Sequence, residues 1–238
     1  MYYSCLHFPE IDSTNNYLKN SYTLLDNFTF VSTDYQSKGK GREARSWISN
    51  MGENLMFSLL IKEEKLLAKA PFFSFYMAVE IANFLIKSDI NNVSIKWPND
   101  IYVNNKKICG ILLESQLPNY LVVGVGINVN QKEFPTDLRK PATSMSLEKR
   151  KTFDLDILKN QLYEQIIKNF LDINHDRYLE FVKQHNYLLN KKVKTNFAGQ
   201  DYIGEVVGID ENFSLQVRIE NLLLHIESGE ITIYENTK

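Results

Sequence analysis

Cysteine is scarce in this 238-residue chain, which has only Cys5 and Cys109. Two cysteines so far apart do not form the disulfide framework of a small secreted domain, so they favour a reducing compartment. Long apolar runs are also missing, because no stretch approaches the roughly 18 residues that a membrane-spanning helix needs. The first residues lack the basic start and apolar core of a signal peptide. We therefore expect a cytoplasmic protein with no membrane anchor.

An excess of charge of one sign is absent as well. The chain has 27 basic and 29 acidic side chains, a net charge of −2, which supports neither a nucleic acid nor a membrane surface as partner. Its hydrophobic residues make up 44% of the chain, as in ordinary globular proteins, and we find no low-complexity segment or internal repeat. The length suits either one sizeable domain or one medium domain with a small one.

The order of the predicted elements indicates an α+β protein. Helices are expected after the cap-forming residues 12–15, over 68–87 with Pro71 in the first turn, and over about 154–187. Strands are expected over 28–35, 53–62, 93–97, 101–105, 107–115 and 120–130, and residues 131–150 are expected to be irregular.

The pattern changes after residue 190. Short alternating runs follow one another there with turns between them, which predicts a small β-barrel or sandwich. We therefore divide the chain into a larger domain over residues 1–187 and a small all-β domain over residues 188–238.

The segment QSKGKGREARSW (36–47) combines two glycines with four cations. A solvated surface loop would explain the charge, but not Gln36 and Trp47 at its two ends. A loop that cradles an anion explains more, because glycines let backbone N–H groups approach a ligand while lysines and arginines supply positive charge. Such a loop can close over a phosphate or carboxylate and exclude water.

Two common nucleotide-binding motifs are rejected for this loop. GKGREA formally matches the dinucleotide fingerprint, but that motif requires a helix directly after it. The following residues 45–57, RSWISNMGENLMF, contain another glycine and have no helical period. A Walker A loop is absent, because no glycine-lysine pair is followed by serine or threonine at the required spacing.

A second polar cluster lies in IKWPNDIYVNNKKICGILLES (95–115). The Asn-Asn pair is expected to turn the chain back, so that Lys107 lies on the strand paired with that of Asp100. Gly110 would leave room there for a ligand to approach. An ordinary turn and an ordinary hairpin lysine are the alternatives, but they do not explain tryptophan, proline, asparagine and aspartate in direct succession.

A third segment, GVGIN (124–128), places two glycines within an apolar strand. Glycine weakens a strand unless something approaches the backbone closely. A ligand and a packed neighbouring element explain the two glycines equally well. Asn128, at the end of the strand, is a candidate hydrogen-bonding partner of a ligand.

In this order, the segments resemble the biotin protein ligases, also called biotin–[acetyl-CoA-carboxylase] ligases. The resemblance extends over nearly the whole chain, including a tail similar to the family's SH3-like domain. The blocks that carry it are DSTNNYL (12–18), QSKGKGREARSW (36–47), KWPNDIYVNNKKICGILLES (96–115) and VVGVGINVN (122–130).

The resemblance implies a mixed central sheet with flanking helices, related to the class II aminoacyl-tRNA synthetases, followed by an SH3-like β-barrel. Many members also carry an N-terminal helix-turn-helix domain that binds DNA. Here the first block begins at residue 12, which leaves no room for one. We therefore expect the short form of the enzyme.

Four positions depart from the commonest pattern of the family. Lys40 replaces an arginine, Glu43 a frequently basic residue, Ala44 the third glycine, and Cys109 a small residue. Lys40 keeps the charge but loses the bidentate geometry of arginine, and Ala44 stiffens the loop slightly. These substitutions bear on the details of loop closure.

The resemblance implies two half-reactions. Biotin reacts with ATP, in the presence of Mg²⁺, to give biotinyl-5′-AMP and pyrophosphate. A lysine of a biotin carboxyl carrier protein then takes the biotinyl group and AMP is released. The carrier would be a domain of acetyl-CoA carboxylase or pyruvate carboxylase. No metal-ligand cluster of the protein itself is expected, and a homodimer is among the states known in the family.

The resemblance also assigns roles to individual residues. Lys107 is expected to bridge biotin's carboxylate and the α-phosphate, and Asp100 either orients Lys107 or accepts a proton from the incoming amine. The expected catalytic residues are Lys107, Arg42, Arg45 and Asp100. The expected biotin-binding residues are Ser13, Thr14, Asn15, Gln36, Lys40, Gly41, Arg42, Lys107 and Gly110. The expected adenylate-binding residues are Arg45, Trp47, Asn99, Lys107 and Asn128.

Three other functions compete with this one. A lipoate or octanoate ligase shares the catalytic fold, but its acyl pocket has no ureido group to bind. A regulator could sense biotin without turnover. A nicotinamide-dependent oxidoreductase would need a helix that residues 45–57 do not offer.

Overall fold

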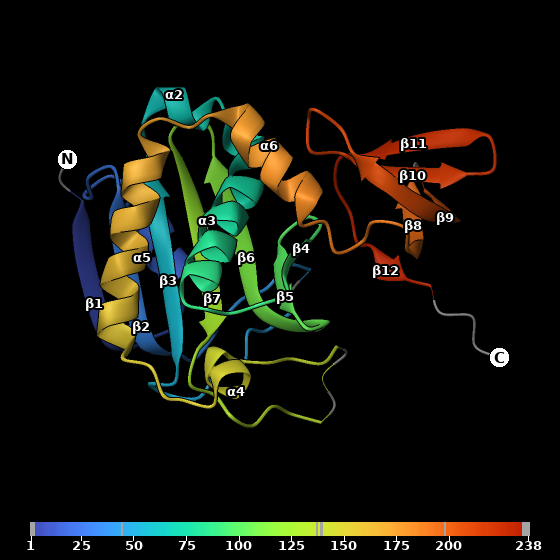
Figure 1. The fold of residues 1–238 in the computed structure, drawn as a ribbon. Coiled ribbons are helices and arrows are strands. Elements are labelled where there is room, and N and C mark those ends of the chain that lie inside the picture. Colours follow the sequence, from blue (N-terminus) through green and yellow to red (C-terminus); the bar gives the residue numbers. More distant parts are fainter. Residues whose placement is uncertain (1–2, 44, 137, 139, 198, 235–238) are drawn as a thin grey trace.

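A computed structural model describes residues 3–43, 45–136, 138, 140–197 and 199–234, and its elements form a large and a small sheet with helices packed on the large one (Figure 1). Ala44, one of the departures noted above, lies outside the described residues. Among these ranges, no helix is long and apolar enough to cross a membrane.

The large sheet has seven strands in the order β1-β2-β3-β7-β6-β5-β4. Strand β1 runs parallel to β2, whereas the other neighbouring pairs are antiparallel. The predicted mixed central sheet is therefore confirmed. The strands are β1 (Ser4–Ile11), β2 (Thr29–Gln36), β3 (Asn54–Ile61), β4 (Val93–Lys96), β5 (Asp100–Val103), β6 (Lys106–Gln116) and β7 (Tyr120–Asn128).

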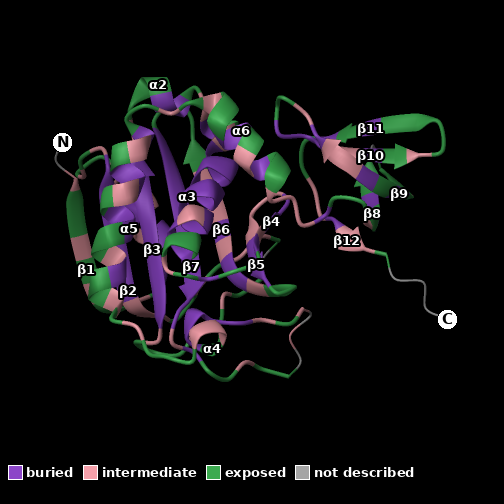
Figure 2. Cartoon of the chain, viewed as in Figure 1, coloured by how far each residue is buried: buried purple, intermediate pink, exposed green. Residues whose placement is uncertain are grey.

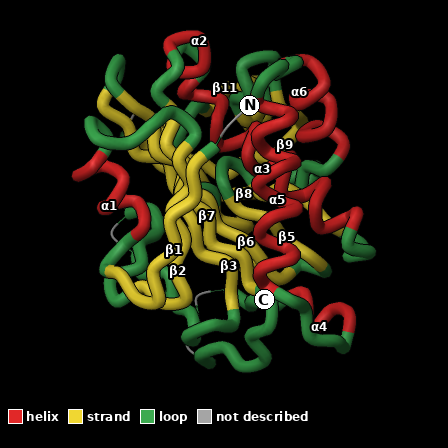
Figure 3. The backbone as a smooth tube through the Cα atoms, turned by 90° about the vertical axis from the view of Figure 1, so that its left-hand side faces the viewer, coloured by secondary structure: helices red, strands yellow, loops and turns green. Residues whose placement is uncertain are grey.

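Helices cover both faces of this sheet. The helices α3 (Phe73–Lys87), α5 (Leu155–Phe170) and α6 (His175–Gln184) lie on one side, and α1 (Thr14–Ser21) lies on the other (Figure 3). Because layers pack on both faces, β3 and β7 are buried along their whole length (Figure 2). This explains why their sequences read as continuous apolar runs.

Some predicted elements differ from those observed. The helix expected over 68–87 begins at Phe73, because Pro71 lies in a short 3-10 turn, η1 (Ala70–Phe72), that follows α2 (Glu64–Leu67). The region expected to be helical over 154–187 breaks into α5 and α6, and the Asn174 side chain caps α6 by accepting from the N–H of Arg177 at 2.9 Å.

Besides α2 and η1, two further elements were not predicted. Strand β1 pairs with β2 at the edge of the sheet and is mostly exposed, so its apolar pattern is weak. Residues 131–150, expected to be irregular, include helix α4 (Met145–Lys149), in which the Ser144 hydroxyl accepts from the N–H of Leu147 at 3.3 Å.

The small sheet is antiparallel, with the order β11-β10-β9-β8-β12. This sheet docks against the larger domain through Phe213. The Phe213 ring stacks on that of Phe75 with 4.6 Å between the ring centres, and the Phe213 carbonyl accepts from the Trp97 indole N–H at 2.9 Å. The predicted boundary after residue 187 falls between α6 and this sheet. The strands are β8 (Lys192–Phe197), β9 (Gln200–Ile209), β10 (Leu215–Ile219), β11 (Leu222–Ile226) and β12 (Thr232–Ile233).

Candidate functional site

A cavity of about 60 Å³, the small cavity, lies where the start of α1 meets β2, β6 and β7. Local structure places its residues: Ser13 caps α1, and Gln36 is the last residue of β2. Every residue predicted to bind biotin lines this cavity, although these come from distant segments. They are Ser13, Thr14, Asn15, Gln36, Lys40, Gly41, Arg42, Lys107 and Gly110.

Buried polar side chains at this cavity hydrogen-bond to one another. The hydroxyls of Thr14 and Ser58 lie 2.6 Å apart, and Ser58 Oγ donates to Asn15 Oδ1 at 2.5 Å. The amide of Asn15 donates to Glu114 Oε2 at 2.8 Å, and the N–H of Thr14 donates to Gln36 Oε1 at 2.9 Å. The network holds these groups in fixed orientations before any ligand arrives.

Sequence reasoning missed two members of this network. Ser58 is the one hydroxyl residue in the apolar strand NLMFSLLI, which was the available signal. Glu114 forms an ion pair with Lys19. Burial alone would raise the pKa of Glu114, but the hydrogen bonds from Lys19 and Asn15 outweigh it, so its pKa is lowered and the carboxylate stays ionised.

The two glycines of β7 make room for site side chains. A Cβ at Gly124 would lie 2.2 Å from Asn15 Oδ1, and one at Gly126 would lie 2.5 Å from Trp47 Cε2. Asn15 and Trp47 therefore rest directly on the backbone of β7. Of the two explanations left open above, packing against a neighbour applies, and both neighbours line the small cavity.

A second cavity, the large cavity, has a volume of about 250 Å³ and adjoins the first at Lys107, Arg42 and Trp47. Its walls come from the loop after β2, residues 96–99, the hairpin of β5 and β6, described residues of the segment after β7 and residues 229–231. One part of the wall is apolar and includes Trp47, Ile48, Phe134, Leu138 and Ala142. Another part carries charges, which are Arg42, Glu43, Arg45, Lys96, Asp100, Lys107, Lys140 and Glu230.

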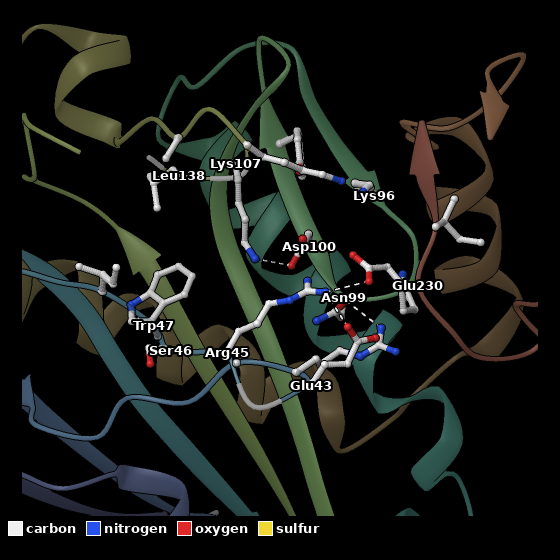
Figure 4. Close-up of a pocket in the computed structure, with 18 of the residues that line it drawn as sticks. Glu43, Arg45, Ser46, Trp47, Lys96, Asn99, Asp100, Lys107, Leu138 and Glu230 are labelled. Atoms are coloured by element: carbon white, nitrogen blue, oxygen red, sulfur yellow. Dashed lines mark hydrogen bonds and ion pairs between the residues drawn. The ribbon is translucent and has the colours of Figure 1, made fainter. Parts of the chain in front are cut away.

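Lys107 lies between the two cavities and is ion-paired to Asp100 at 2.7 Å (Figure 4). The predicted hairpin is confirmed, because Asn104 and Asn105 both adopt positive φ angles, of 49° and 65°, between the paired strands β5 and β6. The ammonium of Lys107 also lies 5.6 Å from the centre of the Trp47 ring. Asp100 therefore lies directly beside Lys107, as both of its predicted roles require, and the choice between those roles stays a prediction.

The charged loop lies over the two cavities and contacts the segment between β11 and β12. Arg42 donates to Asn99 Oδ1 and to the carbonyl of Gly229, both at 3.2 Å. Arg45 pairs with Glu43 at 2.5 Å and with Glu230 at 2.8 Å (Figure 4). Gly229 and Glu230 were not predicted, and no local feature of the sequence brings them to this site.

Two predicted adenylate residues also have structural partners. The side chain of Asn128 is 4% exposed and donates to the carbonyl of Thr143 at 3.0 Å. Asn99 donates to the carbonyl of Ile111 at 2.8 Å while accepting from Arg42. Both side chains line the large cavity, and their hydrogen bonds to backbone carbonyls make its wall more rigid.

The loop is followed by the strand β3, and the described residues between 45 and 57 form no helix. This confirms the rejection of the dinucleotide-binding motif. Within the described part of the chain, no group of three or more histidine, cysteine, aspartate or glutamate side chains could hold a metal ion.

Known proteins resemble this chain in sequence and in structure. The bifunctional ligase/repressor BirA of Salmonella typhimurium is 28% identical over 232 residues, which cover 94% of this chain and 72% of that protein. The biotin–[acetyl-CoA-carboxylase] ligase of Paracoccus denitrificans is 34% identical over 123 residues, covering 50% of this chain and 51% of that one.

The structure of the biotin protein ligase from Aquifex aeolicus in complex with biotin and ATP superimposes with a TM-score of 0.84. It is 27% identical and the match covers 99% of this chain and 100% of that one. Residues 7–130 match the model of the biotin/lipoate A/B protein ligase family. The chain therefore belongs to this family.

Proposed function

We propose that this protein activates biotin with ATP to form biotinyl-5′-AMP and then transfers the biotinyl group to a lysine of a carrier protein. The chain is a biotin protein ligase by its family, its relatives and its structural neighbours. The observation that carries the mechanism is the junction at Lys107, where a small polar cavity meets a larger cavity that has both apolar and cationic walls.

The small cavity suits the ureido ring of biotin. That ring is planar and uncharged, with N–H donors and a carbonyl acceptor, and Thr14 and Asn15, which Ser58 holds by hydrogen bonds from behind the cavity, offer matching groups. The valeryl chain would run toward Lys107, which brings its carboxylate to the border of the large cavity. Buried hydrogen-bonding groups reject a ligand that lacks the matching atoms.

In the first half-reaction, a carboxylate oxygen of biotin forms a bond to the α-phosphorus of ATP. The bond from that phosphorus to the bridging oxygen breaks, and pyrophosphate leaves with the electron pair. Lys107 neutralises both anions as they approach, and Asp100 holds it in place at 2.7 Å. Fixed charges of this kind stabilise the transition state without having to reorganise.

In the second half-reaction, the nitrogen of a carrier lysine attacks the carbonyl carbon of the anhydride. The bond from that carbon to the phosphate oxygen breaks, AMP leaves with the electron pair, and the attacking nitrogen loses a proton to solvent as the amide forms. Until then, Arg42 and Arg45 on the closed loop shield the anhydride from water. The apolar wall at Trp47 and Phe134 is suited to the adenine ring.

The residues present also fit Mg²⁺ bound together with ATP. Mg²⁺ in nucleotide sites is held by one or two carboxylates and by substrate phosphates rather than by a protein cage. Asp100 is the carboxylate that lies beside the proposed phosphate path, and Asn128 offers an oxygen nearby on the same wall. The ion would neutralise phosphate charge.

The proposed partner is the carrier domain of a biotin-dependent carboxylase. ATP and such carriers occur together in the cytoplasm, so we propose that the enzyme works there, in agreement with its two unpaired cysteines. We also propose that the protein forms a homodimer. The test is its molecular mass in solution, measured with and without biotin and ATP.

The decisive experiment is to incubate the protein with biotin, MgATP and a biotin carboxyl carrier domain, and to measure the carrier's mass. We expect one added biotinyl group. Lys107→Ala should slow the transfer at least roughly 100-fold, as expected when one charge-stabilising group is removed. Lys106→Ala is the matched control, because Lys106 precedes Lys107 in the chain, is exposed and lines neither cavity.

Two results would contradict the proposal. If lipoate or octanoate were transferred in preference to biotin, the enzyme would be an acyl ligase of the other branch of its family. If biotin bound but no ATP-dependent transfer occurred, the protein would act as a biotin sensor.

A further inference from the structure

Lys96 is a buried lysine that the mechanism above does not use. It is the last residue of β4 and is 6% exposed, yet it lines the large cavity. Figure 4 shows its side chain beside Asp100 in that cavity. Lys140, from the segment after β7, lines the same cavity and lies close enough to Lys96 to lower its pKa.

A buried ammonium group is costly unless an anion compensates its charge. Among the described residues, the ammonium of Lys96 forms no ion pair with a carboxylate; it lies 5.8 Å from the centre of the Tyr102 ring and within hydrogen-bonding reach of the Lys140 side chain. Asp100 is paired with Lys96 across the strands β4 and β5, but its carboxylate is bound to Lys107. Two cations therefore face one cavity without a described carboxylate of their own.

The chemistry of the cavity indicates which anion completes this pair. Biotin's carboxylate and the α-phosphate belong at Lys107, where the two cavities join. The apolar wall suits a base. Of the parts of ATP, the β- and γ-phosphates remain, and they carry most of its negative charge.

Resting on the proposed function, we propose that Lys96 and Lys140 bind the β- and γ-phosphates of ATP and hold pyrophosphate as it leaves. When the bond from the α-phosphorus to the bridging oxygen breaks, negative charge grows on the departing pyrophosphate. Cations placed there favour the transition state of the first half-reaction. They contribute nothing to the second half-reaction, in which AMP is the leaving group.

The test separates the two half-reactions in the full-length protein. Exchange of labelled pyrophosphate into ATP in the presence of biotin measures the first step. Transfer from synthetic biotinyl-5′-AMP to the carrier domain measures the second step and shows that each variant is folded. The variants are Lys96→Met, Lys140→Met and the double substitution. Lys132→Met is the control, because Lys132 is exposed in the same segment as Lys140 and lines neither cavity.

We expect Lys96→Met to slow exchange by roughly 10- to 100-fold, which is the range for losing one charge-assisted hydrogen bond. The KM values for ATP and for pyrophosphate should rise. Transfer from the preformed adenylate should match that of the unsubstituted protein, and Lys96→Arg should retain exchange. Equal losses in both steps, or full exchange in the double variant, would overturn the proposal. No transfer from the adenylate by the unsubstituted protein would instead overturn the proposed function itself.

Discussion

The small and the large cavity share Lys107 but are built in different ways. Around the small cavity, the polar groups on α1, β2 and β3 are hydrogen-bonded mainly to one another, as with Thr14, Ser58 and Asn15. Around the large cavity, the arginines sit on a loop and are held by acceptors from elsewhere, as Arg45 is by Glu230. The first surface is preorganised, whereas the second must exchange partners.

This difference follows from the ligands. An uncharged ring gains little from Coulomb attraction, so its binding depends on hydrogen bonds aligned in advance on rigid elements. A polyphosphate attracts cations strongly and can replace the bonds of Arg42 to Asn99 and to the Gly229 carbonyl. We therefore expect the loop to open when ATP enters and to close again around the adenylate.

The largest effect on this comparison is expected from Arg42→Ala. Arg42 ties the loop to Asn99 and to Gly229, so its loss should loosen the cover over the anhydride. Retention of biotinyl-5′-AMP should weaken by roughly 10- to 100-fold. The measurement is the amount of free adenylate that appears in solution with biotin and ATP but without carrier.

Lys38→Ala is the matched control for this prediction. Lys38 is an exposed cation of the same loop and lines neither the small nor the large cavity. If Arg42→Ala released no more adenylate than this control, the loop would not act as the cover.

Ser58→Ala should have a smaller effect, confined to the small cavity. The substitution leaves the buried Asn15 Oδ1 without its donor and removes one of the two partners of the Thr14 hydroxyl, so the Kd for biotin should rise roughly tenfold. The KM for ATP should not change, because Ser58 does not line the large cavity. Calorimetric titration with biotin and steady-state kinetics measure the two quantities.

Ser88→Ala is the control, since that hydroxyl donates to the Phe84 carbonyl at the end of α3, outside both cavities. A rise in the KM for ATP as large as the rise in the Kd for biotin would show that the two cavities do not act independently.

The sequence predicts the parts of this site that depend on local structure. The Asn104-Asn105 turn pairs two adjacent strands, so the proximity of Lys107 to Asp100 follows from neighbouring residues alone. The biotin-binding set rested on the resemblance to a family, and the structure brings that whole set to one cavity. The central sheet was likewise predicted in outline.

The parts that depend on long-range packing were not predicted. Ser58 reaches Thr14 because the helix α1 packs on the strand β3, and Glu230 reaches Arg45 because the small sheet docks against the larger domain. Neither contact leaves a periodic pattern or a motif near the residues concerned. Lys96 carried a weak signal, a charge at the end of an apolar strand.

The smallest expected effect is a pH dependence of the KM for ATP that the Kd for biotin does not share. Burial, with a smaller contribution from the nearby Lys140, lowers the pKa of Lys96 to about 7. The other charged groups facing it are Asp100, which raises that pKa, and Lys107, which lowers it. Above pH 7 the empty enzyme loses a positive charge that the phosphates would use, so the KM for ATP should rise a few-fold by pH 9.

Stability should change in the opposite direction over the same range. Lys96 has an ordinary pKa of 10.5 when unfolded and about 7 when folded, so the unfolded state binds more protons between these values. Its contribution to the free energy of unfolding therefore rises with pH in that window, while ATP binding weakens. Lys96→Arg keeps its charge throughout, so both slopes should be smaller in urea titrations and in the KM for ATP. Equal slopes in the variant and the unsubstituted protein would show that another group titrates.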